Sequence, residues 1–292
     1  SYIHDLTIRG AVSGKGNAGA IAGYASGTAP KIANCFNYAV ITSTGNNVGG
    51  LVGYTYQNAV IENCANFGAV TGGSSAGGII GGTVGNGSTI TGCYNTAEIS
   101  ATGSKAGGII GGTSSEMTVT SCYNTGKISG TASGGIAGEV KGNVNWSGTM
   151  QGKITISSCY STGEAGSAVF GTVDTASSEI SKCYYLNTLN ADANAEALNE
   201  ADLKDADLSD AFGPVCGGYP ALRWQSDVTF HEAAGEGTVT APLCTVKGYT
   251  RYSCSKCGES YRTAYTAPLG HDFCAVSLSD RLTPWAQIET RL

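Results

Sequence analysis

The chain has 292 residues, a formal net charge of −6 and only 13% charged side chains. This balance offers no cationic surface to a phosphate backbone, so nucleic acid is not an expected partner. No apolar run reaches the roughly 20 residues of a membrane-spanning helix, and no basic segment followed by an apolar one opens the sequence. Glycine is abundant (44 residues) and no collagen triplet is present, which favours many short strands joined by tight turns.

One short segment repeats along the first two thirds of the chain. Its clearest copies are residues 90–99 and 119–128, which share Cys-Tyr-Asn-Thr at their centres. The anchor positions of all copies are Leu6, Cys35, Cys64, Cys93, Cys122, Cys159 and Cys183. The first four intervals are 29 residues each, and the last two are 37 and 24. A fixed period of this size is typical of a repeat architecture.

Each repeat also carries an apolar step flanked by glycine, as in residues 78–81 and 108–111. Short β-branched runs punctuated by glycine predict strands and turns. We therefore predict an all-β fold, a parallel β-helix (β-solenoid) of about seven coils over residues 1–188, with equivalent residues stacked into ladders. The expected inward ladders are Ile3, Ile32, Ile61, Ile90, Val119, Ile156 and Ile180, and Val12, Ile41, Val70, Ile99 and Ile128.

The anchor cysteines are expected to be buried thiols. Leu6 stands where later copies have cysteine, and free cysteine packs as a small hydrophobe. The alternative is a disulfide between neighbouring coils, which is disfavoured because side chains stacked in parallel point the same way.

One polar row and one aromatic row follow the cysteines in the repeat. Asparagine stands two positions later, at residues 37, 66, 95 and 124, where stacked amides predict a structural hydrogen-bond ladder rather than a ligand site. An aromatic residue usually stands one position later, and the candidates for stacking on a sugar ring are Tyr94, Tyr123 and Tyr160. Stacking along the solenoid explains this row equally well.

The long interval between Cys122 and Cys159 contains an insertion after Gly138, at residues 139–153. Insertions in repeat proteins map to loops, often on a binding face. Trp146 at its centre is therefore a candidate contact residue, and the alternative is that Trp146 covers apolar surface of the solenoid.

These motifs resemble a known repeat family. A β-branched residue, two spacers, Cys-Tyr-Asn-Thr-Gly and a later Gly-Gly-Ile-x-Gly are similar to the glycine-rich GLUG-type repeats of large surface proteins of Gram-positive, often gut-dwelling, bacteria. The resemblance covers about the first two thirds of the chain and implies an extracellular scaffold beside other modules of a longer protein.

Residues 189–225 change in composition and predict a short helical and aromatic cap. Good helix formers follow an Asp-rich start, and residues 218–224 (GYPALRW) supply the aromatic part, expected to lie over the last coil. Bacterial proteins similar in this segment close their repeat tracts with such a piece.

Residues 226–273 predict a small β module rich in cysteine. Cys254 and Cys257 form a Cys-x-x-Cys-Gly knuckle, and Cys244 with His271 could complete a tetrahedral zinc site, with His231 as the alternative histidine. A disulfide from Cys244 to either knuckle cysteine competes with this interpretation. The segment resembles a small module found in tandem in clostridial surface proteins, and residues 274–292 are expected to be a tail or an incomplete further module.

The expected function is that of an extracellular structural or adhesive segment of a bacterial surface protein, a spacer or a presented binding face, with host or cell-wall glycan or protein as partner. The alternative is a glycan-binding module that uses the aromatic row or the Trp146 loop. A β-helix carbohydrate-active enzyme is disfavoured, because the acids of the coils are scattered and the coils lack histidine after His4. The chain is therefore not expected to be an enzyme.

Overall fold

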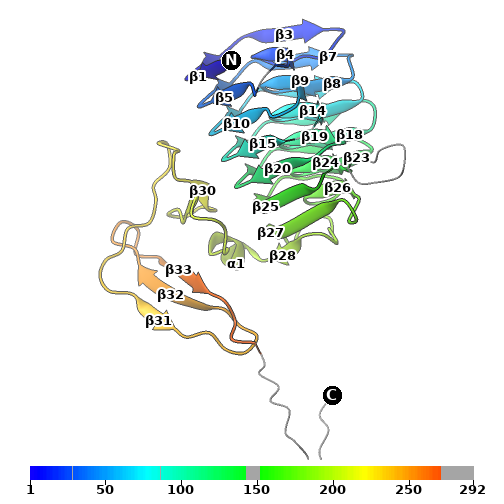
Figure 1. The fold of residues 1–292 in the computed structure, drawn as a ribbon. Coiled ribbons are helices and arrows are strands. Elements are labelled where there is room, and N and C mark those ends of the chain that lie inside the picture. Colours follow the sequence, from blue (N-terminus) through cyan, green and yellow to red (C-terminus); the bar gives the residue numbers. More distant parts are fainter. Residues whose placement is uncertain (28, 86, 143–151, 271–292) are drawn as a thin grey trace, which may run out of the picture.

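The structure is a computed structural model, and it describes residues 1–27, 29–85, 87–142 and 152–270. Parallel strands stack into a β-solenoid of about six turns (Figure 1), which confirms the predicted parallel β-helix. The turns number about six rather than about seven because the last copy of the repeat, at Cys183, lies on a strand that continues one side of the stack only.

The largest sheet forms one side of the solenoid in two rows. The first row is β1 (Tyr2–His4), β5 (Lys31–Ala33), β10 (Val60–Glu62), β15 (Ser88–Thr91), β20 (Met117–Thr120) and β25 (Ile154–Ser161). The second row is β2 (Thr7–Ile8), β6 (Phe36–Asn37), β11 (Ala65–Asn66), β16 (Tyr94–Asn95) and β21 (Tyr123–Asn124), which also pairs with β25. β27 (Ser178–Leu186) and β28 (Glu196–Leu198) extend this sheet at its end.

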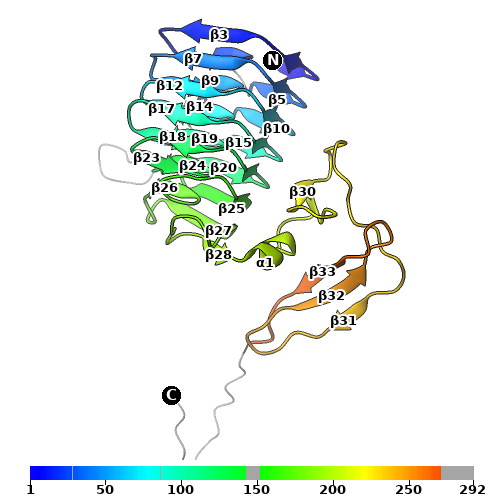
Figure 2. The same cartoon turned by 180° about the vertical axis from the view of Figure 1, so that it is seen from behind.

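Three further parallel sheets complete each turn (Figure 2). One contains β3 (Ala11–Gly14), β7 (Val40–Ser43), β12 (Val70–Gly72), β17 (Ile99–Ala101) and β22 (Ile128–Ser129). The next contains β8 (Asn47–Gly49), β13 (Ser75–Gly77), β18 (Lys105–Gly107) and β23 (Ala132–Gly134). The last contains β4 (Ala22–Ala25), β9 (Val52–Tyr56), β14 (Ile80–Val84), β19 (Ile110–Thr113), β24 (Ala137–Val140) and β26 (Phe170–Val173).

The two predicted apolar ladders are confirmed. Ile61 pairs with Ile32 on one side and Ile90 on the other, and Val70 pairs likewise with Ile41 and Ile99. Their side chains fill the interior together with the glycine-flanked apolar residues, among them Ile79 before β14 and Ile109 before β19. Burial of these side chains at every turn supplies the main stabilisation of the stack.

The predicted asparagine ladder runs through the interior. The Nδ2 of Asn66 donates to Oδ1 of Asn95 at 2.7 Å, and Nδ2 of Asn95 donates to Oδ1 of Asn124 at 2.8 Å. Each amide also donates to a backbone carbonyl two residues later, as Asn95 does to Ala97 at 2.8 Å. All four asparagines have no exposed surface, so the ladder satisfies polar groups that would otherwise be costly to bury.

A row of glycines packs directly on this ladder. A β-carbon on Gly78 would lie 2.0 Å from the carbonyl oxygen of Gly108 and 2.7 Å from Cγ of Asn95. A β-carbon on Gly108 would lie 2.4 Å from Cγ of Asn124. Side chains are excluded at these positions because the asparagine amides and the adjoining backbone already occupy the space.

The cysteine side chains of the repeats are buried, as predicted. The thiol of Cys64 donates to the carbonyl of Glu62 at 3.1 Å. Burial raises the pKa of the Cys93 and Cys122 thiols well above its ordinary value, so they stay protonated and unreactive. Leu6 occupies the equivalent place in the first turn, where it is 43% exposed because it lies at the end of the stack.

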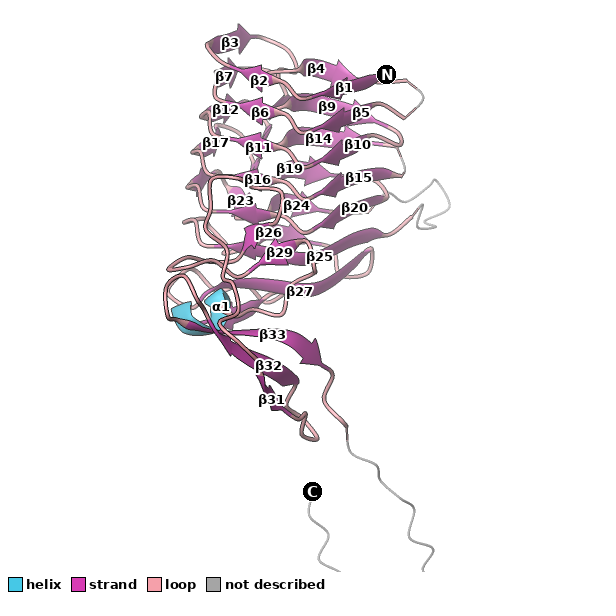
Figure 3. Ribbon diagram, turned by 90° about the vertical axis from the view of Figure 1, so that its left-hand side faces the viewer, coloured by secondary structure: helices cyan, strands magenta, loops and turns pink. Residues whose placement is uncertain are grey.

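The cap at residues 189–225 contains α1 (Glu200–Lys204), β29 (Phe212–Gly213) and β30 (Ala221–Leu222). Its first part continues the end of the stack, where β28 pairs with β27. Its aromatic part does not lie over the last turn as expected but runs back along the side of the solenoid (Figures 1 and 3). Nε1 of Trp224 donates to the carbonyl of Gly92 at 3.0 Å. Gly92 directly follows β15, which lies three turns before β27 in the stack. The physical reason is the aromatic row on that side, with which Phe212, Leu222 and Trp224 form one apolar cluster.

The C-terminal module is a three-stranded antiparallel sheet of β31 (Thr238–Thr240), β32 (Gly248–Ser253) and β33 (Ser260–Thr266). Polar contacts join it to the cap. Arg262 Nε donates to Asp205 at 2.8 Å, and Lys247 pairs with Asp207 at 2.8 Å.

We predict that Asn95→Ala lowers the free energy of unfolding by about 3 kcal/mol or more, because Asn66 loses its acceptor and Asn124 its donor inside the core. Urea denaturation measures this. The control Asn46→Ala removes an exposed amide and should change stability by no more than about 0.5 kcal/mol. An effect of Asn95→Ala as small as that of the control would show that the ladder is dispensable.

Candidate metal centre

The aromatic row is covered by the cap. Tyr94 and Tyr123 stack with ring centres 4.8 Å apart, and Tyr123 and Tyr160 with centres 5.1 Å apart. Trp224 packs 5.6 Å from Tyr94, and Phe212 packs 5.8 Å from Tyr160. The three tyrosines are at most 6% exposed. Their faces are therefore closed to a sugar ring while the cap is in place, which corrects their assignment as an exposed binding platform.

The hydroxyl groups of the row explain why it is tyrosine rather than phenylalanine. Tyr123 donates to Oε1 of Gln225 at 3.1 Å, and Tyr160 donates to the carbonyl of Pro220 at 2.7 Å. Buried phenols need such partners. The row is thus the docking surface of the cap.

Two predicted site residues cannot be placed. Trp146 and His271 lie outside the residues that the structure describes.

A second cluster joins the cap to the C-terminal module. Residues 214–216 pair with residues 229–231, where Cys216 N donates to Thr229 O and His231 N donates to Pro214 O, both at 2.9 Å. This pairing brings Cys216 and His231 together. Cys254 and Cys257 come from the knuckle between β32 and β33, held by a bond from Gly258 N to the carbonyl of Cys254 at 3.0 Å.

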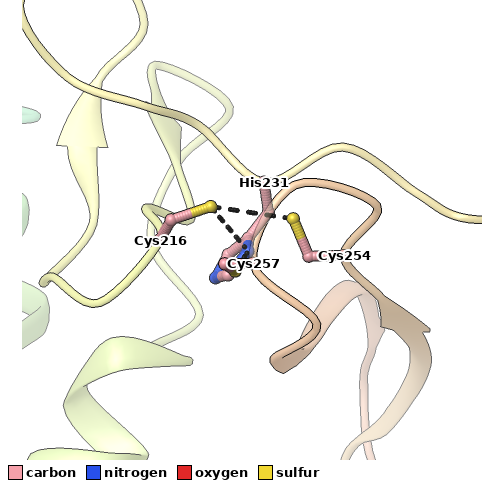
Figure 4. A group of neighbouring side chains, drawn as sticks. All are labelled: Cys216, His231, Cys254 and Cys257. Atoms are coloured by element: carbon pink, nitrogen blue, oxygen red, sulfur yellow. Dashed lines mark hydrogen bonds between the residues drawn. The ribbon is translucent and has the colours of Figure 1, made fainter.

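The four side chains converge on one point (Figure 4). Sγ of Cys216 lies 3.4 Å from Nδ1 of His231 and 3.6 Å from Sγ of Cys254, and Sγ of Cys257 lies 3.4 Å from the same nitrogen. All four ligand atoms lie within 4.8 Å of one another. A tetrahedral zinc ion with its usual bond lengths separates two sulfurs by about 3.8 Å and sulfur from nitrogen by about 3.5 Å. The cluster could therefore hold a metal ion.

The electrostatics of the cluster favour a thiolate at Cys254. Burial alone would raise the pKa of Cys254, but hydrogen bonds from the backbone N–H of Glu232, from His231 and from the N–H groups of the knuckle lower it to about 5. The N–H of Lys256 lies 3.3 Å from the sulfur, and that of Glu232 lies 3.5 Å away. The pKa of Cys216 is raised to about 12, first by its hydrogen bond with Cys257. A cation would reverse that effect by stabilising every thiolate.

The surroundings orient the histidine. Its ring stacks on Tyr261 with centres 4.6 Å apart and planes 2° apart. Nε2 lies 3.9 Å from the carboxylate of Glu259, which accepts a hydrogen bond from Gly217 N at 2.9 Å. The ring thus presents Nδ1 to the cysteines, with a carboxylate behind it of the kind that often supports metal-bound histidine.

The preferred ligand set and the observed cluster share Cys254 and Cys257 and differ at the other two positions. The structure brings Cys254, Cys257 and the alternative histidine, His231, together, whereas Cys244 is exposed and lies outside the group. Cys216 takes its place. Sequence reasoning missed Cys216 because this residue belongs to the cap rather than to the module. The available signal was that Cys216 lies outside the repeat ladder and directly before Gly217.

Comparisons with known proteins identify the repeat. Residues 44–71 match the family model described as the GLUG motif. A stretch of 26 residues, 9% of this chain, is 73% identical to a precorrin-3B C(17)-methyltransferase of Sinorhizobium sp., of which it spans 10%. No solved structure matches the chain. No helix among the described residues is long and apolar enough to cross a membrane.

We predict a pH effect on the stability of the metal-free C-terminal module. The folded pKa of Cys254 is about 5 and that of an unfolded thiol is about 8.5, so the unfolded state binds more protons between these values. The thiolate's contribution to stability is complete above about pH 8.5 and is lost as the pH falls through about 5.

Ultraviolet thiolate absorbance of chelator-treated protein checks this directly. One thiolate should remain near neutral pH and titrate near pH 5 in the parent and in Cys244→Ser, but not in Cys254→Ser. A titration that begins only near the ordinary thiol pKa would contradict the assignment.

Proposed function

We propose that the chain is an extracellular structural segment of a bacterial surface protein, a stiff spacer that carries the C-terminal module. The observation behind this proposal is the regular interior, in which the same residue types pair from one turn to the next. Each added repeat lengthens the solenoid by roughly 4.8 Å. The GLUG match and the solenoid fold fit a repeat-containing structural segment.

We propose in addition that the chain is not an enzyme. Acidic side chains of the turns pair with lysines of neighbouring turns: Lys31–Glu62 at 2.7 Å, Lys105–Glu139 at 2.5 Å, Lys127–Glu164 at 3.4 Å and Lys153–Glu179 at 2.8 Å. Glycoside hydrolysis needs two facing carboxyl groups, one of them kept protonated. The hydrogen bond from Lys153 instead lowers the pKa of Glu179. These pairs support a solvated, ion-paired surface.

Glycan binding remains the second candidate function, at another place than the buried row. Tyr24 and Tyr54 stack on neighbouring turns with ring centres 5.8 Å apart, and Tyr24 is 52% exposed. An aromatic pair with one exposed ring is the kind of surface on which a sugar ring stacks. A glycan array with the parent chain and Tyr24→Ala tests this candidate.

The ion of the metal centre is proposed to be zinc. Three cysteines and one histidine are a ligand set that zinc uses in structural sites, where four protein ligands leave no position for substrate. The low pKa of Cys254 supports binding because zinc takes the thiolate.

We expect purified protein, before chelator treatment, to contain about one equivalent of zinc. Cys257→Ser should reduce this below about a tenth of an equivalent, whereas Cys244→Ser, which lies outside the cluster, should keep it. Elemental analysis and intact mass measure both. Metal-free protein whose mass is lower by two hydrogens, with a Cys216–Cys254 linkage in its peptide map, would replace zinc by a disulfide.

Surface location predicts that antibodies raised against this segment label intact producing cells. Labelling should disappear after brief protease treatment of intact cells, while a cytoplasmic marker protein is preserved. Labelling only after permeabilisation would overturn the extracellular proposal.

A further inference from the structure

We infer that the metal ion is a joint: it fastens the C-terminal sheet β31–β33 to the cap, and its removal releases that sheet while the solenoid stays folded. This inference rests on the zinc proposal and adds what the ion does for the molecule. It follows from how the four ligands are divided and from how little else holds the sheet in place.

The four ligands come from two parts of the chain, and the residues that follow His231 also pair with the knuckle, where Ser255 N donates to the carbonyl of Glu232 at 2.7 Å. Cys216 and His231 are held by the pairing of residues 214–216 with 229–231, next to the cap strand β29. Cys254 and Cys257 belong to the knuckle between β32 and β33. Neither pair alone completes a structural zinc site, which needs four ligands. A bound ion therefore requires both parts at once, and its binding free energy becomes free energy of attachment.

The sheet buries little apolar surface of its own. β31 is exposed along its whole length, and the buried side chains near the cluster are those of Cys254 and Tyr261. Tyr261 is buried by stacking on His231. A three-stranded sheet with so small a core is marginal in water without a disulfide or a metal. The ion thus supports both the fold of the sheet and its position.

Outside the cluster, polar contacts join the sheet to the cap. Arg262 binds Asp205 and Asp202, the hydroxyl of Tyr265 donates to the carbonyl of Asp205, and Lys247 pairs with Asp207. The Arg262–Asp205 pair and the carboxylate of Asp207 are largely covered, whereas Lys247 and Asp202 are well exposed. Ion pairs with exposed partners contribute little and weaken in salt. They guide the sheet to the cap but do not hold it there without the ion.

The solenoid is independent of the cluster. Trp224, Phe212 and Leu222 anchor the cap to the aromatic row through apolar contacts that do not involve the cysteines. Removal of the ion should therefore release the sheet without unfolding the cap or the solenoid, because hydrophobic burial of the cap on the solenoid is unchanged.

The test compares zinc-loaded and chelator-treated full-length chain by hydrogen exchange and small-angle X-ray scattering in moderate salt. Chelation should accelerate exchange in residues 248–266 by about tenfold or more, increase the radius of gyration, and leave exchange in β10 and β15 unchanged. Zinc should restore the starting state. Cys216→Ser and Cys257→Ser should resemble the chelated protein, whereas Cys244→Ser and Arg262→Ala should resemble the loaded parent.

The outcomes separate the two proposals. Zinc present at one equivalent, with exchange and scattering unaffected by chelation or by Cys216→Ser, overturns the joint and leaves zinc binding intact. Protein that never binds zinc overturns both. A variant that also loses protection in β10 and β15 contradicts the independence of the solenoid, on which the inference depends.

Discussion

The stack of buried asparagines against a row of glycines is the constraint on which the solenoid depends. An amide that bonds the amide above, the amide below and its own turn fixes the register of neighbouring turns to a single residue. The glycines pack against the amides too closely to admit a β-carbon, so the backbone that carries them is held next to the ladder. The apolar ladders supply most of the stabilisation but tolerate exchange among Ile, Val and Leu. The polar ladder supplies the uniqueness of the register.

Position in the repeat predicted most of the fold. The inward ladders, the buried thiols and the amide ladder could all be derived because each residue's neighbours were its own copies one period away. The cap and the cluster could not be derived in this way. Trp224 bonds Gly92 across 132 residues, and Cys216 meets Cys254 across 38. Neither contact has a period, so spacing within one segment identified the knuckle and missed the ligand that comes from the cap.

The cysteines fall into two chemical populations. Those of the ladder are buried among apolar side chains, and the raised pKa of Cys93 and Cys122 makes these two thiols inert packing groups. Those of the cluster receive N–H hydrogen bonds and face a histidine, and there the pKa of Cys254 is low. The same residue type thus serves as a packing group in the ladder and as a candidate metal ligand in the cluster.

The cap's return along the aromatic row also has a consequence for the order of assembly. The turns around Tyr94 and Tyr123 can pair as soon as they are made, yet the outer face of their rings stays bare until residues 212–224 arrive. During synthesis the tyrosines are therefore made well before the residues that cover them. Trp224 follows its partner Gly92 by 132 residues, and the stripe of tyrosines stays uncovered until those residues have been made. Such a stripe is a site for mispairing with another copy. If synthesis stops, or a protease cuts, before residue 212, the tyrosines stay uncovered and the shortened chain becomes prone to aggregation.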